Sequence, residues 1–144
     1  MTRNEKRKRI DKAIKEITIP FLRDKGFNGS FLHFRRYQED RINLLTFQHS
    51  LYDEKFVVEI ANCPITGIKT SWKDIEPKKR NAHDMDNRLR LGSEKYNTDY
   101  WFDYEKSSLF SDVYKKRANE IIELWDDAEK WWMDDPFEQR KVNS

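Results

Sequence analysis

The chain has 144 residues, a formal net charge of +2 and a charged fraction of 38%, with enough length for one domain around one sizeable core. The high charge alone would suggest disorder, but aromatic residues make up 14% of the chain, and disordered segments are poor in them. We therefore expect a single folded domain over residues 1–144, in which a few large side chains fill the core beneath a very charged surface.

Other features of the sequence exclude several classes of protein. Cys63 is the sole cysteine, which excludes an internal disulfide and favours a reducing, cytoplasmic setting. The basic stretch at residues 1–12 lacks the apolar segment of a signal peptide, and no run approaches the roughly 18 apolar residues of a membrane span. We therefore expect a cytoplasmic protein without a membrane partner.

The first predicted element is an amphipathic helix over residues 4–25. Its apolar positions recur at helical spacing on one face, at Ile10, Ile14, Ile17 and Phe21. Pro20 should kink or break the last turn, because proline lacks the amide hydrogen that the helix needs. Gly26 suits a left-handed cap, and Phe27 would then fold back onto the helix.

Aromatic and branched residues next dominate three short segments separated by turn residues, which predicts an antiparallel meander of strands. These segments span residues 30–37, 41–50 and 55–62. Two further short strands are expected at residues 88–91 and 99–105, joined across a turn at Gly92. The intervening residues 63–88 carry no periodic pattern, and we expect either a functional loop or a short element within them.

A second amphipathic helix is predicted over residues 111–133. Its apolar stripe consists of Tyr114, Ala118, Ile121, Ile122, Trp125, Ala128 and Trp132. Oxygens for an N-cap are available from Ser107, Ser108 and Ser111. Pro136 should end the helix, and Phe137 can then dock on the core.

Together these elements predict an α+β fold class. We expect a curled antiparallel β-sheet of about five strands, with the N-terminal helix and the long C-terminal helix packed on one face. The basic N-terminal end and the last few residues are expected to be flexible.

Several short motifs occur in the order found in a bacterial protein family. They are "FLRDKGF" at 21–27, "FQHS" at 47–50, "FVVEIA" at 56–61, "RLRLG" at 88–92, "DYWF" at 99–102 and "DDPF" at 134–137. In this ordered set the chain resembles the family catalogued as domain of unknown function 4304 (DUF4304). It departs from that pattern at Trp101-Phe102, where the family favours two tryptophans. The resemblance implies no catalytic residue, although toxin neutralisation in bacterial competition is suggested for some members.

The pattern around "RLRLG" singles out Arg88 and Arg90 as a candidate ligand- or partner-binding pair. If Leu89 points inward, the two arginines share the opposite face at a spacing of about 6.6–6.8 Å, available for a carboxylate or a phosphate. The alternative is that they pair with acids of a neighbouring strand such as Asp103 or Glu59.

Two tryptophans are further candidates for binding a partner. Trp101 belongs to the aromatic strand and either packs in the sheet or contributes to a contact surface. Trp131 points away from the apolar stripe of its helix and lies among carboxylates. Such a tryptophan can anchor a protein partner, since tryptophan is enriched at interface hot spots, or it can cover Pro136 and Phe137.

Catalytic candidates are few. His83, Asp84 and Asp86 offer imidazole and carboxylate ligands for Mg²⁺ or Zn²⁺, but no second histidine motif has ligand spacing, and ordinary polar loop residues explain them as well. Cys63 could act as a nucleophile or be a small buried thiol. No glycine-rich phosphate loop or paired-cysteine motif is present, so no cofactor is expected.

Charge is distributed unevenly along the chain. Residues 1–36 hold 11 Lys/Arg against 4 Asp/Glu, whereas residues 112–138 hold 4 against 9. This asymmetry indicates either a site for a polyanion or two helices with complementary surfaces. A nucleic-acid site would use the basic N-terminal helix through Arg7, Lys8 and Arg9.

The sequence therefore predicts a small binding protein without catalytic chemistry that neutralises or escorts another protein. The toxin-neutralising form of this role is what the family resemblance implies. The alternative is a nucleic-acid-associated protein that uses the basic N-terminal helix. A metal-dependent hydrolase is the third hypothesis. The oligomeric state stays open.

Overall fold

The secondary structure was assigned in a computed structural model, which describes residues 1–66, 68–70, 73–76, 79–106 and 111–135. Its helical elements are α1 (Arg3–Ala13), the π-helical segment η1 (Ile14–Thr18), α2 (Ile19–Asp24), the 3-10 turn η3 (Ala82–Asp84), α3 (Ser93–Tyr96), α4 (Val113–Glu123) and α5 (Trp125–Asp134). Its strands are β1 (Asn28–Ser30), β2 (His33–Tyr37), β3 (Ile42–His49), β4 (Lys55–Cys63), β5 (Ile68–Thr70), β6 (Lys73–Ile75), β7 (Arg88–Arg90) and β8 (Phe102–Asp103).

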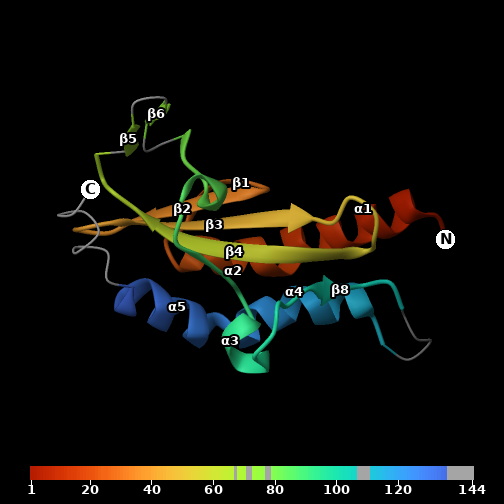
Figure 1. Ribbon diagram of the computed structural model, residues 1–144. Helices are drawn as coiled ribbons and strands as arrows, with labels where there is room; N and C mark the ends of the chain where they lie inside the picture. The colour runs from red at the N-terminus through yellow and green to blue at the C-terminus, as the bar shows by residue number, and fades with distance from the viewer. Residues whose placement is uncertain (67, 71–72, 77–78, 107–110, 136–144) are drawn as a thin grey trace.

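The strands form an antiparallel sheet in the order β1-β2-β3-β4-β7, with β8 also paired to β4. The helices α1 and α2, together with α4 and α5, pack on one face of this sheet (Figure 1). The predicted α+β class and the meander are therefore confirmed. The segment expected as a single strand at residues 30–37 is divided into β1 and β2, which pair with each other.

The N-terminal helix differs from the prediction in how it passes Pro20. Helical structure continues from α1 through η1 to the end of α2, so Pro20 does not break the last turn. Pro20 lies in the first turn of α2, where its missing amide hydrogen removes little, and the π-helical segment precedes it. Within η1 the buried Thr18 hydroxyl donates to the Ala118 carbonyl at 3.0 Å, which ties this segment to α4.

The predicted cap at Gly26 is confirmed. Gly26 has φ +93°, in the left-handed region. The Phe27 amide donates to the Leu22 carbonyl and the Gly26 amide donates to the Arg23 carbonyl, both at 3.0 Å, which is the bonding pattern of a Schellman motif. Phe27 is thereby turned back into the core, where its ring lies 5.3 Å from that of Trp132.

Gly92 does not reverse the chain between two paired strands, so that prediction was wrong. Both strands pair antiparallel with β4. Strand β7 pairs with Glu59–Ala61 and β8 pairs with residues 55–56, so the two lie one after the other along the same edge of β4. Gly92, at φ +100°, instead leads into α3. A Cβ atom at Gly92 would lie 2.4 Å from the Tyr100 ring, so the close approach of that ring requires glycine.

The C-terminal helical segment is divided at Leu124 into α4 and α5. The predicted apolar stripe is confirmed, since six of its members are buried: Tyr114, Ala118, Ile121, Trp125, Ala128 and Trp132. The N-cap is Asp112, whose carboxylate accepts from the Tyr114 amide at 2.9 Å, rather than a serine. The other predicted end signals at Ser107, Ser108, Pro136 and Phe137, and the last few residues, lie outside the described residues.

The second face of the sheet lies away from this helical layer. A smaller cluster lies there and is covered by the segment around η3: Ile42, Leu44, Ala61, Cys63 and Ala82. The stretch at residues 63–88 thus contains the short elements β5, β6 and η3. None of the described helices is long and apolar enough to cross a bilayer.

The two capping glycines provide a matched test of this packing. Gly26→Ala should destabilise the fold by about 1–2 kcal/mol through backbone strain, since an added Cβ there makes only ordinary contact with Arg36. Gly92→Ala should cost about 1–3 kcal/mol more, because its Cβ also collides with Tyr100. Denaturant unfolding of both variants measures the difference, and equal losses of stability would contradict the close packing at Gly92.

Candidate functional site

The candidate site lies on the face of the sheet opposite the helices. Strand β4 alternates, and the side chains that it sends to the main core are Phe56, Val58 and Ile60. Glu59 therefore points to the other face. Because Glu59 pairs with Arg90 and Ala61 pairs with Arg88 in the antiparallel register, both arginines of β7 share the face of Glu59.

Glu59 forms the centre of this site. Its residue is 3% exposed, and burying a carboxylate is costly unless it is paired. Three cationic or donor groups approach it: His83 Nδ1 lies 2.8 Å away, Arg90 Nε 3.3 Å and Arg88 Nε 3.6 Å. The carboxylate thus joins β4 to β7 and to η3. The sequence offered two roles for the arginines, ligand binding or pairing with an acid of a neighbouring strand, and the structure shows the pairing with Glu59.

His83 and His33 form a second part of the site. Because a carboxylate accepts hydrogen bonds, the Nδ1 atom of His83 carries a hydrogen, and its ring is fixed at the Glu59 side. The His33 ring lies 6.4 Å away and nearly perpendicular, and its Nδ1 atom is hydrogen-bonded to the Thr46 hydroxyl at 3.2 Å. Burial, and then the charges of His83 and Arg35, lower the pKa of His33, so this imidazole is neutral at neutral pH.

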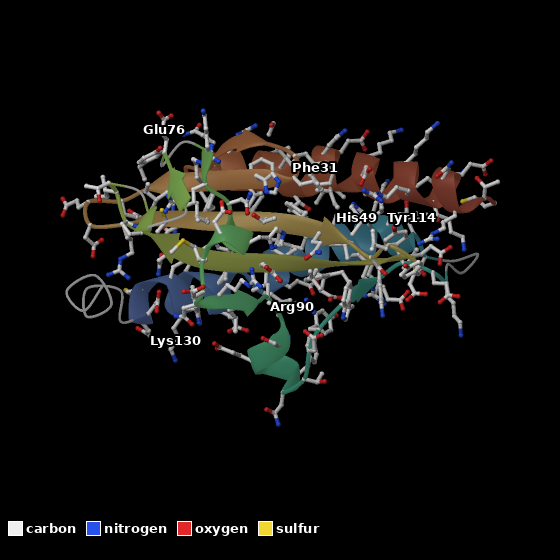
Figure 2. The ribbon with its side chains drawn as sticks, turned by 45° about the horizontal axis from the view of Figure 1, so that its top comes forward. Phe31, His49, Glu76, Arg90, Tyr114 and Lys130 are labelled. Carbon is white, nitrogen blue, oxygen red and sulfur yellow. The ribbon has the colours of Figure 1, made fainter. Side chains whose placement is uncertain are left out.

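Arg90 also holds Trp101 at the surface. Arg90 is labelled in Figure 2. Its Nη1 atom donates to both oxygens of Asp99 at 2.8 and 3.0 Å, and its guanidinium lies 5.2 Å from the Trp101 ring. The Lys55 ammonium lies 4.7 Å from the same ring. The indole of Trp101 therefore contacts two cations. These contacts fix its orientation in the unbound protein.

The structure brings together three of the four residues predicted to bind a partner. Arg88, Arg90 and Trp101 belong to the β7–β8 edge of the sheet. Trp131 lies on α5, is partly buried and packs against the main core, so it belongs to a different part of the molecule.

The weak metal candidates do not converge. His83 is bound to Glu59, and the Asp84 carboxylate accepts from the Asn81 amide at 3.0 Å to cap η3. Asp86 is exposed. Within the described part of the chain, no group of three or more His, Cys, Asp or Glu residues is arranged to hold a metal ion.

Cys63 is a buried thiol with no exposed surface. Its sulfur accepts a hydrogen bond from Arg80 Nη1 at 3.4 Å. Burial raises the pKa of the Cys63 thiol, and the charge of Arg80 opposes this shift only in part. A buried, protonated thiol is a poor nucleophile, so the geometry favours the buried-thiol interpretation.

The three basic residues proposed for nucleic-acid binding do not share one surface. Arg7 is partly buried, and its Nε atom lies 3.5 Å from the Asp11 carboxylate. Lys8 and Arg9 are exposed on the outside of α1. A nucleic acid on this helix would therefore contact Lys8 and Arg9 rather than all three.

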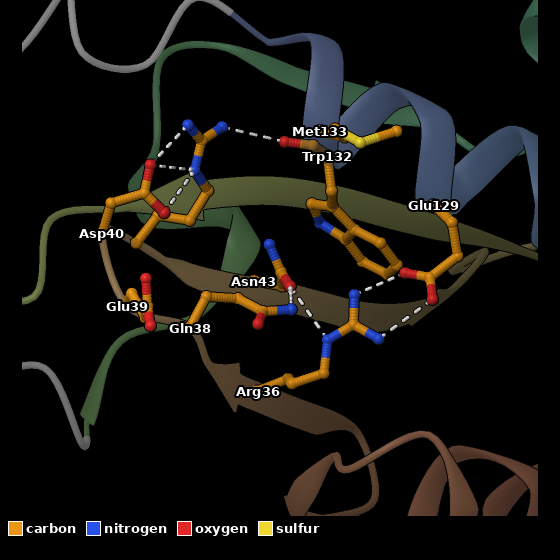
Figure 3. A pocket seen from close by; sticks show the side chains of 9 residues that line it. Arg36, Gln38, Glu39, Asp40, Asn43, Glu129, Trp132 and Met133 are labelled. Carbon is orange, nitrogen blue, oxygen red and sulfur yellow. Dashed lines mark hydrogen bonds and ion pairs between the residues drawn. The ribbon is translucent and has the colours of Figure 1, made fainter.

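A pocket of about 720 Å³ opens between the β2–β3 turn and α5 (Figure 3). Four of its charged side chains already bind within the protein: Arg36, Asp40, Arg41 and Glu129. Arg36 pairs with the Glu129 carboxylate and donates to the Asn43 side chain at 2.9 Å. Arg41 donates to the Trp132 carbonyl at 2.9 Å. These contacts join the turn to α5, and they make this pocket a structural joint rather than the candidate site.

Sequence reasoning missed the role of Glu59 as the centre of the site. It named Glu59 as one of two acids that could pair with the arginines, and His83 as a metal ligand. The alternation of β4 already placed Glu59 away from the core face. The approach of His83 had no signal in the sequence, because it depends on how residues 63–88 fold over the sheet.

Comparison with protein families identifies the chain. The model of the family "Domain of unknown function (DUF4304)" matches residues 17–135, so the chain belongs to this family, and the resemblance seen in the sequence is confirmed. Comparisons with curated proteins and with solved structures find no match.

Proposed function

We propose that this chain is a non-catalytic protein-binding module of the cytoplasm, and that Arg88, Arg90 and Trp101 form its contact surface. The observation that carries the proposal is Trp101, held at the sheet edge between the Arg90 guanidinium and the Lys55 ammonium. Tryptophan and arginine are the residues most enriched among interface hot spots.

The chemistry of this surface favours an acidic protein partner. The Arg88 side chain is 42% exposed and that of Arg90 33% exposed, so both reach solvent, with Glu59 contacting both and Asp99 also pairing with Arg90. Side chains that are already fixed lose little conformational entropy on binding. A carboxylate-rich surface would complement these cations, and neutralisation of a toxin with such a surface is the specific form of the function that we propose.

Capture of a partner tests this proposal. The full chain is used as bait in a native lysate of its source cells, and bound proteins are identified by mass spectrometry. A partner that binds the wild type should be reduced about tenfold or more by Trp101→Ala or by Arg88→Ala, because each removes a side chain of the contact surface.

Lys8→Ala, which removes a cation from α1, is the matched control and should retain the partner. Thermal unfolding of each variant distinguishes a loss of binding from a loss of folding. Retention of the partner at wild-type levels by both surface variants would contradict the surface, and repeated recovery of no partner would contradict the function.

A second candidate is a nucleic-acid-associated protein, and one observation favours it. The outer side of α1 and η1 exposes four cations, Lys8, Arg9, Lys12 and Lys15. Lys12 is partly offset by Glu16 at 3.9 Å. A row of lysine and arginine on one helix can follow a phosphate backbone without reading its sequence.

Salt dependence of binding tests this candidate. The affinity for double-stranded DNA should fall linearly with salt on logarithmic axes, and the combined Lys8→Ala and Arg9→Ala variant should lower the slope by about 0.9 for each phosphate that is no longer neutralised. Arg88→Ala, on the other face, should leave the slope unchanged. Absence of binding at low salt, or an unchanged slope in the α1 variant, would exclude this function.

A further inference from the structure

A second pocket, of about 630 Å³, lies where the N-terminal helix meets the end of β3. The chain has three histidines, and all three line this pocket. Two arginines of α1 line it as well, so that five groups able to carry positive charge surround one cavity: Arg3, Arg7, His33, His49 and His83. The volume is that of a site for a small molecule.

His49 is the group that points to a ligand. It is the last residue of β3, and its side chain is 5% exposed (Figure 2). Among the described residues neither ring nitrogen makes an aligned hydrogen bond, and the nearest carboxylate oxygen is Asp11 Oδ1, 3.1 Å from Nε2. Its ring packs between aromatic neighbours, 5.8 Å from the Phe56 ring and 6.3 Å from the Phe31 ring. A buried polar group that lacks an aligned hydrogen bond is destabilising, and a bound ligand could supply that hydrogen bond.

An imidazole and a guanidinium that line this pocket converge on the carboxylate of Asp11. His49 Nε2 lies 3.1 Å from one oxygen of Asp11, and Arg7 Nε lies 3.5 Å from the other. Neither contact has the alignment of a hydrogen bond, because His49 Nε2, Arg7 Nε and Asp11 Oδ1 are all without one. His49 and Arg7 thus lie close to an anionic oxygen, but neither makes an aligned hydrogen bond to Asp11.

A second guanidinium, that of Arg3, comes from the first turn of α1. The Arg3 Nη2 atom donates to the Leu51 carbonyl at 2.7 Å, which places this guanidinium over the loop that follows His49. Asp53 also lines the pocket, and Lys55 lies 3.9 Å from its carboxylate. Two arginines from one helix, with imidazoles lining the same pocket, are a donor set that can bind phosphate oxygens.

We infer that this pocket binds the phosphate group of a small phosphomonoester through Arg3, Arg7 and His49. The pocket is larger than a phosphate ion alone, so the remainder of the ligand would occupy the part lined by His33 and His83. The inference goes beyond the proposed protein-binding function, because none of the three contact residues Arg88, Arg90 and Trp101 lines this pocket.

Nuclear magnetic resonance of the histidine rings tests the inference in the full chain. Inorganic phosphate is titrated into the protein, and a chloride titration at equal ionic strength serves as the reference. We expect the His49 ring signals to shift saturably with phosphate and not with chloride. Arg7→Gln should weaken phosphate binding about tenfold, since it removes one charge-assisted pair of hydrogen bonds.

Arg9→Gln, which removes an exposed cation of the same helix, is the matched control and should bind phosphate as the wild type does. Arg3→Gln is the second pocket variant and should weaken binding similarly if Arg7→Gln perturbs folding. Adenosine 5′-monophosphate tests whether the pocket accepts a ligand larger than phosphate, and it should bind. Adenosine should not bind, because it lacks the phosphate group.

Three results would overturn the inference. The first is a His49 shift that does not saturate or that chloride reproduces. The second is equal loss of binding in Arg9→Gln and in the pocket variants. The third is binding of acetate or adenosine as tight as that of the phosphorylated probes.

Discussion

The buried carboxylate of Glu59 is the interaction on which the second face of the sheet depends. It is placed by the alternation of β4, and it draws His83 from η3 and two arginines from β7 onto one point. A carboxylate left there without partners would cost several kcal/mol, so the loop and the edge strand are held to the sheet by the need to satisfy it. The same contacts hold Arg88 and Arg90 on the solvent side of the sheet. They also fix the ring of His83, which lines the second pocket together with His33 and His49 (the histidine pocket). The proposed contact surface therefore rests on Glu59, and so does the part of the second pocket that His83 lines.

Local patterns were sufficient to predict much of the fold. Helical spacing identified the stripe from Tyr114 to Trp132, period-two alternation identified the strands, and Gly26 with Phe27 identified a cap. The predictions that were wrong concern residues whose local structure depends on tertiary contacts. Pro20 was accommodated because a π-helical segment precedes it and packs on α4. Gly92 serves the close approach of the Tyr100 ring, which no local pattern contains.

The candidate site was predictable only where its residues share a strand pair. Arg88 and Arg90 could be placed on one face from their spacing, and Glu59 could be named among the acids of neighbouring strands able to pair with them. The histidine pocket could not be predicted, because Arg7, His49 and His83 come from α1, β3 and η3 and meet only when these elements pack. Trp131 could not be assigned either, since it lies off the apolar stripe and its packing against the core is a tertiary contact.

The coupling between Glu59 and Arg90 is the most direct test of this account. A double-mutant cycle of Glu59→Gln and Arg90→Gln, followed by denaturant unfolding, should give a coupling free energy of about 1 kcal/mol or more. The exposed pair Lys12 and Glu16, 3.9 Å apart, should give about 0.3–0.5 kcal/mol in a parallel cycle. Effects of the Glu59 and Arg90 substitutions that add to within about 0.3–0.5 kcal/mol would contradict the claim that this carboxylate holds the edge strand to the sheet.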